Sequence, residues 1–195
     1  MVKNFYAFLN LGLAGFVLAT VSARFVFPTV SSEGAAFWII RTAPISLRSF
    51  LWSKFWTGLV PVLALSLTLT VVANEFLAVD PFLKVVTAGG IVLMSLALVG
   101  LATGLGARYP RFAADNATQV AGSPGGVAYM IAAVSYILVM VVLLGWPASL
   151  YLWRMSRIHV RPFQPDEVGL ISASFLAAVA AWKMFRTVRL PALSA

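Results

Sequence analysis

Five long runs of apolar residues dominate this sequence and restrict what it can fold into. A helix that crosses a membrane needs about 20 mainly apolar residues to span roughly 30 Å of hydrocarbon. Backbone N–H and C=O groups in lipid must be paired within the segment, and the runs lack the alternation of barrel strands. The sequence therefore predicts an all-α, polytopic transmembrane helix bundle, a single domain of about five spans. The predicted spans are 5–23, 55–79, 82–107, 127–146 and 168–185.

The charged residues are too few to cover a water-facing surface. They make up 10% of the 195 residues, whereas a soluble domain carries about 25%. The net charge is +8, but the charges lie in short segments between the apolar runs, which indicates a membrane face and not a nucleic-acid partner. Cysteine is absent and His159 is the one histidine, so disulfides and a multi-histidine metal site are excluded. We therefore expect the lipid bilayer to surround most of the chain.

The distribution of Lys and Arg predicts which ends of the spans face the cytoplasm. Nine of these residues fall on one side: Arg24, Arg41, Arg48, Lys54, Arg108, Arg111, Lys183, Arg186 and Arg189. Five fall on the other: Lys3, Lys84, Arg154, Arg157 and Arg161. The bias predicts a multi-pass protein of the cell (inner, cytoplasmic) membrane with its N-terminus outside and its C-terminus in the cytoplasm.

The first apolar run allows more than one interpretation. Lys3, the run itself and Val21-Ser22-Ala23 resemble the regions of a cleaved signal peptide. Arg24 directly after the run is equally typical of a membrane anchor. An odd number of spans with an external N-terminus also fits a piece of a longer protein.

Local signals mark several helix boundaries. Asp80-Pro81 and Ser123-Pro124 each offer an N-cap residue followed by proline at the first helical position. Pro61 lies inside the second predicted span, where we expect a kink.

Residues 31–56, SSEGAAFWIIRTAPISLRSFLWSKFW, are too polar to span and too apolar for a free loop. Ser31 or Ser32 can cap a short helix, Pro44 breaks it, and Ser46 can cap a second helix that continues into the next span. This predicts a cytoplasmic interfacial helix–turn–helix. Six aromatic side chains suit the headgroup level: Phe37, Trp38, Phe50, Trp52, Phe55 and Trp56. A passive interfacial anchor explains these features as well.

The order of residues in this segment adds a further indication. It reads Glu33-Gly34, then Arg41-Thr42-Ala43-Pro44-Ile45-Ser46, then Lys54-Phe55. This order resembles ABC-2-type transporter permeases, in which an acid and a glycine precede a short helix, a Pro-Ile/Leu-Ser turn and a lysine. Together with the GLGARYPRF run at 104–112 and Asn116, the pattern is similar to a family of ABC exporter membrane subunits, whose C-terminal half residues 24–150 would match.

The resemblance implies roles for particular residues. The segment 31–54 would carry the coupling helix that docks on a separate ABC ATPase subunit, which would bind ATP and Mg. The implied coupling surface consists of Glu33, Gly34, Arg41, Pro44, Ser46, Arg48 and Lys54. Arg108, Pro110 and Arg111 are a possible second cytoplasmic contact, for which lipid headgroups are an equal alternative. Segment 147–167 would be an external element before the last span.

Three closely spaced glycines and two neighbouring polar residues lie within the predicted spans. Gly100, Gly104 and Gly106 are spaced for close helix packing, either against a second permease half or homodimer partner or within one bundle. Asn74 and Glu75 lie near the outer end of their span, where we expect them to be exposed.

Motifs for catalysis are missing from the sequence, which has no G-x-x-x-x-G-K-[ST] phosphate loop, no G-x-S-x-G elbow and no H-E-x-x-H pair. We therefore expect no enzyme activity, bound metal or cofactor in this chain. The predicted function is a membrane-spanning permease subunit of an ABC-type exporter. The alternative is a non-transporting membrane anchor or scaffold.

Overall fold

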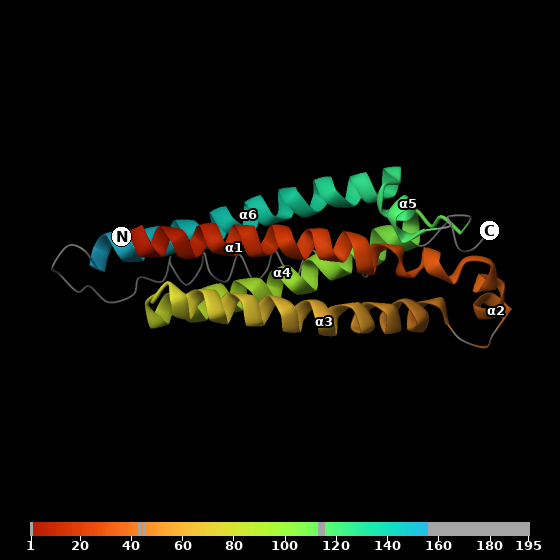
Figure 1. Cartoon of the computed structure of the whole chain (residues 1–195), viewed down its shortest axis with the longest axis horizontal. Helices are drawn as coiled ribbons and strands as arrows, with labels where there is room; N and C mark the ends of the chain where they lie inside the picture. Colours follow the sequence, from red (N-terminus) through yellow and green to blue (C-terminus); the bar gives the residue numbers. More distant parts are fainter. Residues whose placement is uncertain (1, 43, 45, 113–115, 156–195) are drawn as a thin grey trace.

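The computed structural model describes residues 2–42, 44, 46–112 and 116–155, and this part of the chain is an elongated bundle of helices without strands (Figure 1). The all-α expectation is therefore confirmed. The predicted fifth span, 168–185, lies outside the described residues, as do Arg157, His159, Arg161, Lys183, Arg186 and Arg189.

Four helices among the described residues are long and apolar enough to cross a membrane. They are contained in α1 (Val2–Val21) with its helical continuation, α3 (Leu47–Phe76), α4 (Pro81–Arg108) and α6 (Pro124–Met155). Helix α3 begins before the predicted limit at 55. Helix α6 continues past 146, so the first part of the predicted external segment is helical and the rest of that segment is not described.

The predicted capping residues account for where α3 and α6 begin. The Ser46 hydroxyl accepts a hydrogen bond from the Ser49 amide at 3.2 Å, and the Ser123 hydroxyl accepts one from the Gly126 amide at 3.2 Å. Each bond satisfies an amide that has no partner inside its helix. Asp80 occupies the N-cap position of α4, with proline following it as predicted. Pro61 lies inside α3, which continues through it.

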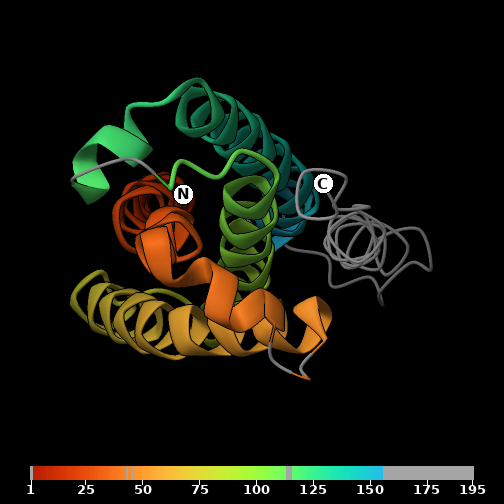
Figure 2. The same ribbon diagram turned by 90° about the vertical axis from the view of Figure 1, so that its right-hand side faces the viewer.

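Helix α4 is the central helix of the bundle. Viewed from one end, it lies between α1, α3 and α6 (Figure 2). In its most apolar stretch, 56% of the residues are buried, against 50% in the span that contains α1 and 28% in α3 and in α6. Its buried side chains Ile91, Met94 and Leu98 form the middle of the main apolar cluster. A buried α4 with more exposed outer helices indicates a bundle whose outer surface suits lipid.

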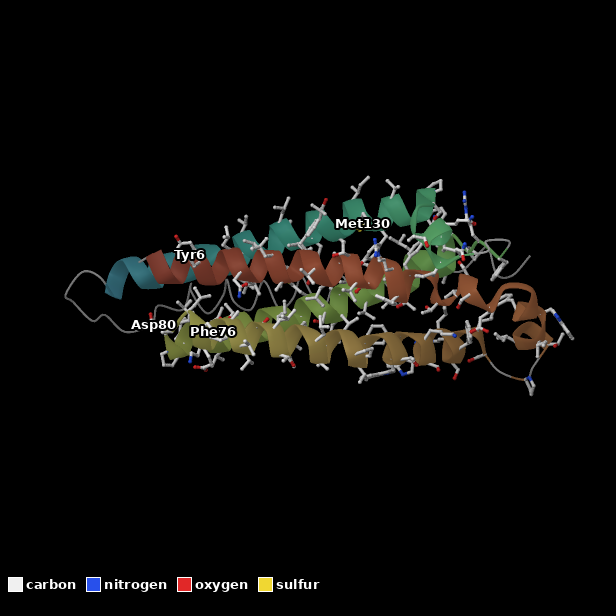
Figure 3. All side chains as sticks on the ribbon, viewed as in Figure 1. Tyr6, Phe76, Asp80 and Met130 are labelled. Atoms are coloured by element: carbon white, nitrogen blue, oxygen red, sulfur yellow. The ribbon has the colours of Figure 1, made fainter. Side chains whose placement is uncertain are left out.

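Large apolar side chains cover the outer faces of the other long helices. Val60 and Phe76 of α3 are 62% and 88% exposed, and Ile131 of α6 is 64% exposed. In water such a surface would be unfavourable, but in a bilayer it contacts acyl chains. Figure 3 shows that Tyr6, Phe76 and Asp80 lie toward one end of the bundle and Met130 toward the other, as expected for antiparallel spans.

Hydrogen bonds between buried polar side chains join α3 to α4. Ser66 and Ser95 hydroxyls are 3.0 Å apart, and the Asn74 side-chain amide donates to the Thr87 hydroxyl at 2.9 Å. The expectation that Asn74 is exposed is therefore wrong, because this residue is only 3% exposed and faces α4. Glu75, one residue on, points outward and pairs with Lys84 at 2.7 Å.

The chain between α1 and α3 changes its winding several times. A π-helical turn at Ser22–Val26 follows α1, then come 3-10 segments at Phe27–Thr29 and Ser31–Ala36 and the short α2 (Phe37–Thr42). The predicted N-cap at Ser31 or Ser32 is wrong, because the preceding Val30 is already in the right-handed helical conformation and leaves no helix start to cap.

Candidate functional site

The residues singled out in the 31–54 segment gather at one end of the bundle, together with the end of α4 and the short α5 (Ala117–Ala121) (Figure 1). We call this region the end platform and define it as residues 31–42, 44 and 46, the first turns of α3 (47–54) and the segment 108–112. It joins the predicted coupling segment and the predicted second contact in one surface.

An ion pair holds the first two parts of the end platform together. Lys54 of α3 donates to the carboxylate of Glu33, which lies in the 3-10 segment before α2. The two side chains are 25% and 26% exposed, so the pair is partly shielded from water. The Lys54 ammonium also lies 5.4 Å from the ring centre of Phe50, within cation–π range. The ion pair fixes the 3-10 segment against the start of a spanning helix, and the cation–π contact holds Lys54 against its own helix.

Aromatic rings join the third part of the end platform to the other two. The Phe37 ring of α2 stacks on Phe112 with centroids 4.8 Å apart and meets Phe50 of α3 edge-on at 6.4 Å. The Ser31 hydroxyl accepts a hydrogen bond from the Arg111 amide at 3.1 Å. No sequence signal indicates Phe112 as the partner of Phe37, because it lies in a connecting segment 75 positions further along the chain.

Gly34 has a backbone conformation that explains why glycine stands there. Its φ is +49° and its ψ is −129°, a combination that is essentially restricted to glycine. The turn kinks the Ser31–Ala36 segment two residues before its end, and α2 begins at Phe37. Any other residue at 34 would strain the backbone next to Glu33, so Gly34 supports the ion pair through its conformation.

The remaining platform residues present an exposed basic surface. Arg48, Arg108 and Arg111 are exposed, and among the described residues no carboxylate pairs with them. The Arg108 guanidinium lies 6.0 Å from the ring centre of Tyr109. Pro44 and Ser46 are also exposed, and Pro110 is half-buried. For Arg41 the structure describes only the backbone, which lies in α2.

The aromatic residues of the segment divide between the surface and the core. Trp38, Trp52 and Trp56 are 65%, 42% and 48% exposed, which suits the predicted headgroup level. Phe55 is fully buried in the main apolar cluster, so its predicted position in the headgroups is wrong. Its place on α3 turns it toward the bundle, whereas the tryptophans beside it face outward.

The three predicted packing glycines are buried in α4. A Cβ on Gly106 would overlap the backbone carbonyl oxygen of Phe27, so a neighbouring segment approaches α4 closely at this position. Gly104 and Gly100 lie two and six residues earlier on the same helix.

The described residues contain no group of three His, Asp or Glu side chains that could hold a metal ion.

The hydrogen bond between Asn74 and Thr87 is not among the contacts predicted from the sequence. The spacing of Ser66, Thr70 and Asn74, each one helical turn after the last, could have indicated a polar stripe facing another helix.

The long apolar helices with their outward apolar side chains define a multi-pass α-helical membrane protein, and the end platform adds a structured surface at one end. The chain belongs to the family described as "Putative ATP-binding cassette", whose model matches residues 1–188. No curated protein and no solved structure matches the chain. Membership of this family connects the chain with ABC transporters, as the sequence resemblance implied in general terms.

Proposed function

We propose that this chain is the membrane-spanning permease subunit of an ABC-type exporter of the ABC-2 type. In this role it receives the motion of a separate ATPase subunit, which binds ATP and Mg, hydrolyses the nucleotide and docks on the end platform. The substrate crosses the membrane beside the spanning helices, together with a second permease half or a second copy of the chain.

The ion pair between Glu33 and Lys54 is the observation that carries this proposal. A docking surface can move a membrane domain only if it is attached to a spanning helix. The pair links the 3-10 segment to α3, and the Phe37–Phe112 stack links α2 to the end of α4. A force applied to residues 31–46 would therefore reach two spanning helices directly.

The charge of the end platform supports docking of an acidic protein surface. Arg48, Arg108 and Arg111 are exposed at the same end of the bundle as the ion pair. Exposed charges of one sign speed up association with a partner of opposite sign. The chain has no phosphate-binding loop of its own, so the proposal assigns ATP hydrolysis to the partner.

The proposal requires a defined orientation in the membrane. The end platform would face the cytoplasm, because the ATPase works there, and the turn between α3 and α4 would face outside. This agrees with the excess of Lys and Arg in the segments that the fold places at the platform end, among them Arg24, Arg48, Arg108 and Arg111.

Pull-down of an ABC ATPase subunit with variants of this chain tests the proposal. The variant is Arg41→Glu/Arg48→Glu, and the control is Lys3→Glu/Lys84→Glu, which changes the charge equally at the opposite end. We expect recovery of the ATPase to fall for the first pair and to stay at the wild-type level for the second. Equal recovery with all three chains would reject docking on the end platform and favour the membrane-anchor alternative.

A further inference from the structure

The connection between α1 and the end platform contains an unusual local structure. The α-helical winding of α1 widens to a π-helical turn at Ser22–Val26 and then tightens to a 3-10 turn at Phe27–Thr29. Single π turns and 3-10 stretches inside long helices often mark functional hinges. The change from wide to tight winding occurs between Val26 and Phe27.

Glycines from three other helices surround this point. A Cβ on Gly58 of α3 would lie 3.1 Å from both γ-methyl groups of Val26. A Cβ on Gly106 of α4 would overlap the Phe27 carbonyl oxygen. A Cβ on Gly125 of α6 would overlap the Tyr109 Cβ at 2.6 Å and would lie 3.3 Å from the Phe27 ring. A Cβ on Gly106 has no room against Phe27, a Cβ on Gly58 would push Val26 aside by a few tenths of an ångström, and a Cβ on Gly125 would meet Tyr109 before Phe27.

Val26 and Phe27, the two residues that these three glycines surround, are held tightly. Val26 is 2% exposed and Phe27 is fully buried. The Phe27 ring lies 6.0 Å from the ring of Tyr129, whose hydroxyl donates to the Ala19 carbonyl oxygen at 3.3 Å. Contacts of this kind leave little free space, so a displacement of Val26 or Phe27 must displace its neighbours too.

We propose that Val26 and Phe27 are the joint that positions the end platform on the bundle, with Gly58, Gly106 and Gly125 as positioning residues. The importance of the joint for transport rests on the proposed function. The joint lies directly before the 31–36 segment and touches α3, α4 and α6 at once. A movement of the end platform is transmitted through it to three spanning helices, while the π turn accommodates the change in α1.

The joint can be tested by adding side-chain volume at Gly58 and removing it from Val26, which Gly58 faces. Gly58→Val adds methyl groups where Val26 already fills the space, and Val26→Ala removes the two γ-methyl groups that they would meet. The Val26 Cβ is 3.6 Å from the Gly58 Cβ position, so an alanine at 26 leaves ordinary contact. The double variant Gly58→Val/Val26→Ala is therefore expected to restore the wild-type arrangement. Gly89→Val is the control, because a Cβ there meets nothing within 4 Å.

The first measurement reports the position of the end platform without any partner. Because the chain contains no cysteine, nitroxide labels can be attached to Thr42→Cys in α2 and Thr118→Cys in α5, which are both exposed. Their distance distribution is measured by pulsed electron paramagnetic resonance in bilayers. We expect Gly58→Val to shift or broaden the distribution, the double variant to restore it, and Gly89→Val to leave it unchanged.

The second measurement uses the complex with the ATPase subunit. We expect Gly58→Val to recover as much ATPase as the wild type but to lower permease-stimulated ATP hydrolysis about two- to thirtyfold, the range for residues that couple two sites. The double variant should regain the stimulation.

The outcomes separate the joint from the proposed function. An unchanged label distance in Gly58→Val, or an altered distance that Val26→Ala does not restore, would overturn the joint. If the wild-type chain recovers no ATPase, the proposed function fails, while the label distances still decide whether Val26 and Phe27 position the end platform. Normal stimulation in Gly58→Val with ATPase bound would overturn the role of the joint in coupling.

Discussion

The side chains of Glu33 and Lys54 form an ion pair across 21 positions of the sequence, and this pair attaches the 3-10 segment before α2 to the first turns of α3. Neither residue has another charged partner among the described residues. The end platform therefore depends on a contact between two residues that the sequence shows only as separate members of a pattern.

Breaking this ion pair should loosen the end platform without unfolding the bundle. Glu33→Gln removes the charge, and because both side chains are about a quarter exposed we expect a loss of roughly 0.2–1 kcal/mol. Hydrogen exchange should report this as faster exchange of the amides at 31–42, with α4 unchanged. Glu75→Gln is the matched control, since it breaks the Glu75–Lys84 pair at the opposite end. Equal exchange at 31–42 in Glu33→Gln and the wild type would contradict the prediction.

Asn74→Leu should weaken the contact between α3 and α4. Leucine has a similar size but cannot donate to the Thr87 hydroxyl, which itself still donates to the Leu83 carbonyl oxygen at 2.8 Å. Hydrogen bonds between membrane helices contribute about 0.6 kcal/mol on average and at most about 1.7 kcal/mol, and we expect a loss of this size in the free energy of unfolding.

Unfolding in mixed micelles measures the effect of Asn74→Leu. The control is Thr68→Val in the same helix, where an exposed hydroxyl donates only to the Ala64 carbonyl oxygen of its own helix. The same loss of stability in both variants would show that Asn74 does not join the two helices.

Gly106→Ala adds only one methyl group, but it should destabilise the protein strongly. The new Cβ would overlap the Phe27 carbonyl oxygen, and a backbone atom cannot turn aside as a flexible side chain can. Overpacking of this kind costs about 1–3 kcal/mol. Gly89→Ala in the same helix meets nothing within 4 Å and should be neutral or stabilising by roughly 0.5–1 kcal/mol. Thermal unfolding of both variants in detergent checks the difference, and a stable Gly106→Ala would contradict the close approach.

Cysteine labelling should place Ser46 and Thr118 on one side of the membrane and Ala78 on the other. All three are exposed, and the chain has no cysteine to interfere. Ser46 lies in the end platform and Thr118 in α5 at the same end of the bundle, whereas Ala78 lies in the turn between α3 and α4. In oriented vesicles, an impermeant maleimide should reach Ser46→Cys and Thr118→Cys from the cytoplasmic side only. Labelling of Ser46→Cys only from outside would reverse the orientation.

The helices of this fold can be predicted from the sequence because their causes are local. Long apolar runs must become helices in lipid, since each backbone group needs a partner inside its own segment. Ser46 and Ser123 mark the starts of α3 and α6 for a similar reason, because a capping side chain reaches only to amides two or three positions ahead. The order of residues in segment 31–54 also suggests a candidate site, but it does not indicate which of these residues contact one another.

The contacts depend on how the helices face one another, which no short stretch of sequence contains. Asn74 is buried because α3 turns that face toward Thr87, whereas the neighbouring Glu75 stays outside. Phe37 finds Phe112 only when α2 folds back across the end of α4. Apolar periodicity states which residues prefer lipid or core. Which residues from distant segments contact each other depends on the register and rotation of the packed helices. Many side chains together determine that register and rotation, so no short stretch of sequence predicts the contacts.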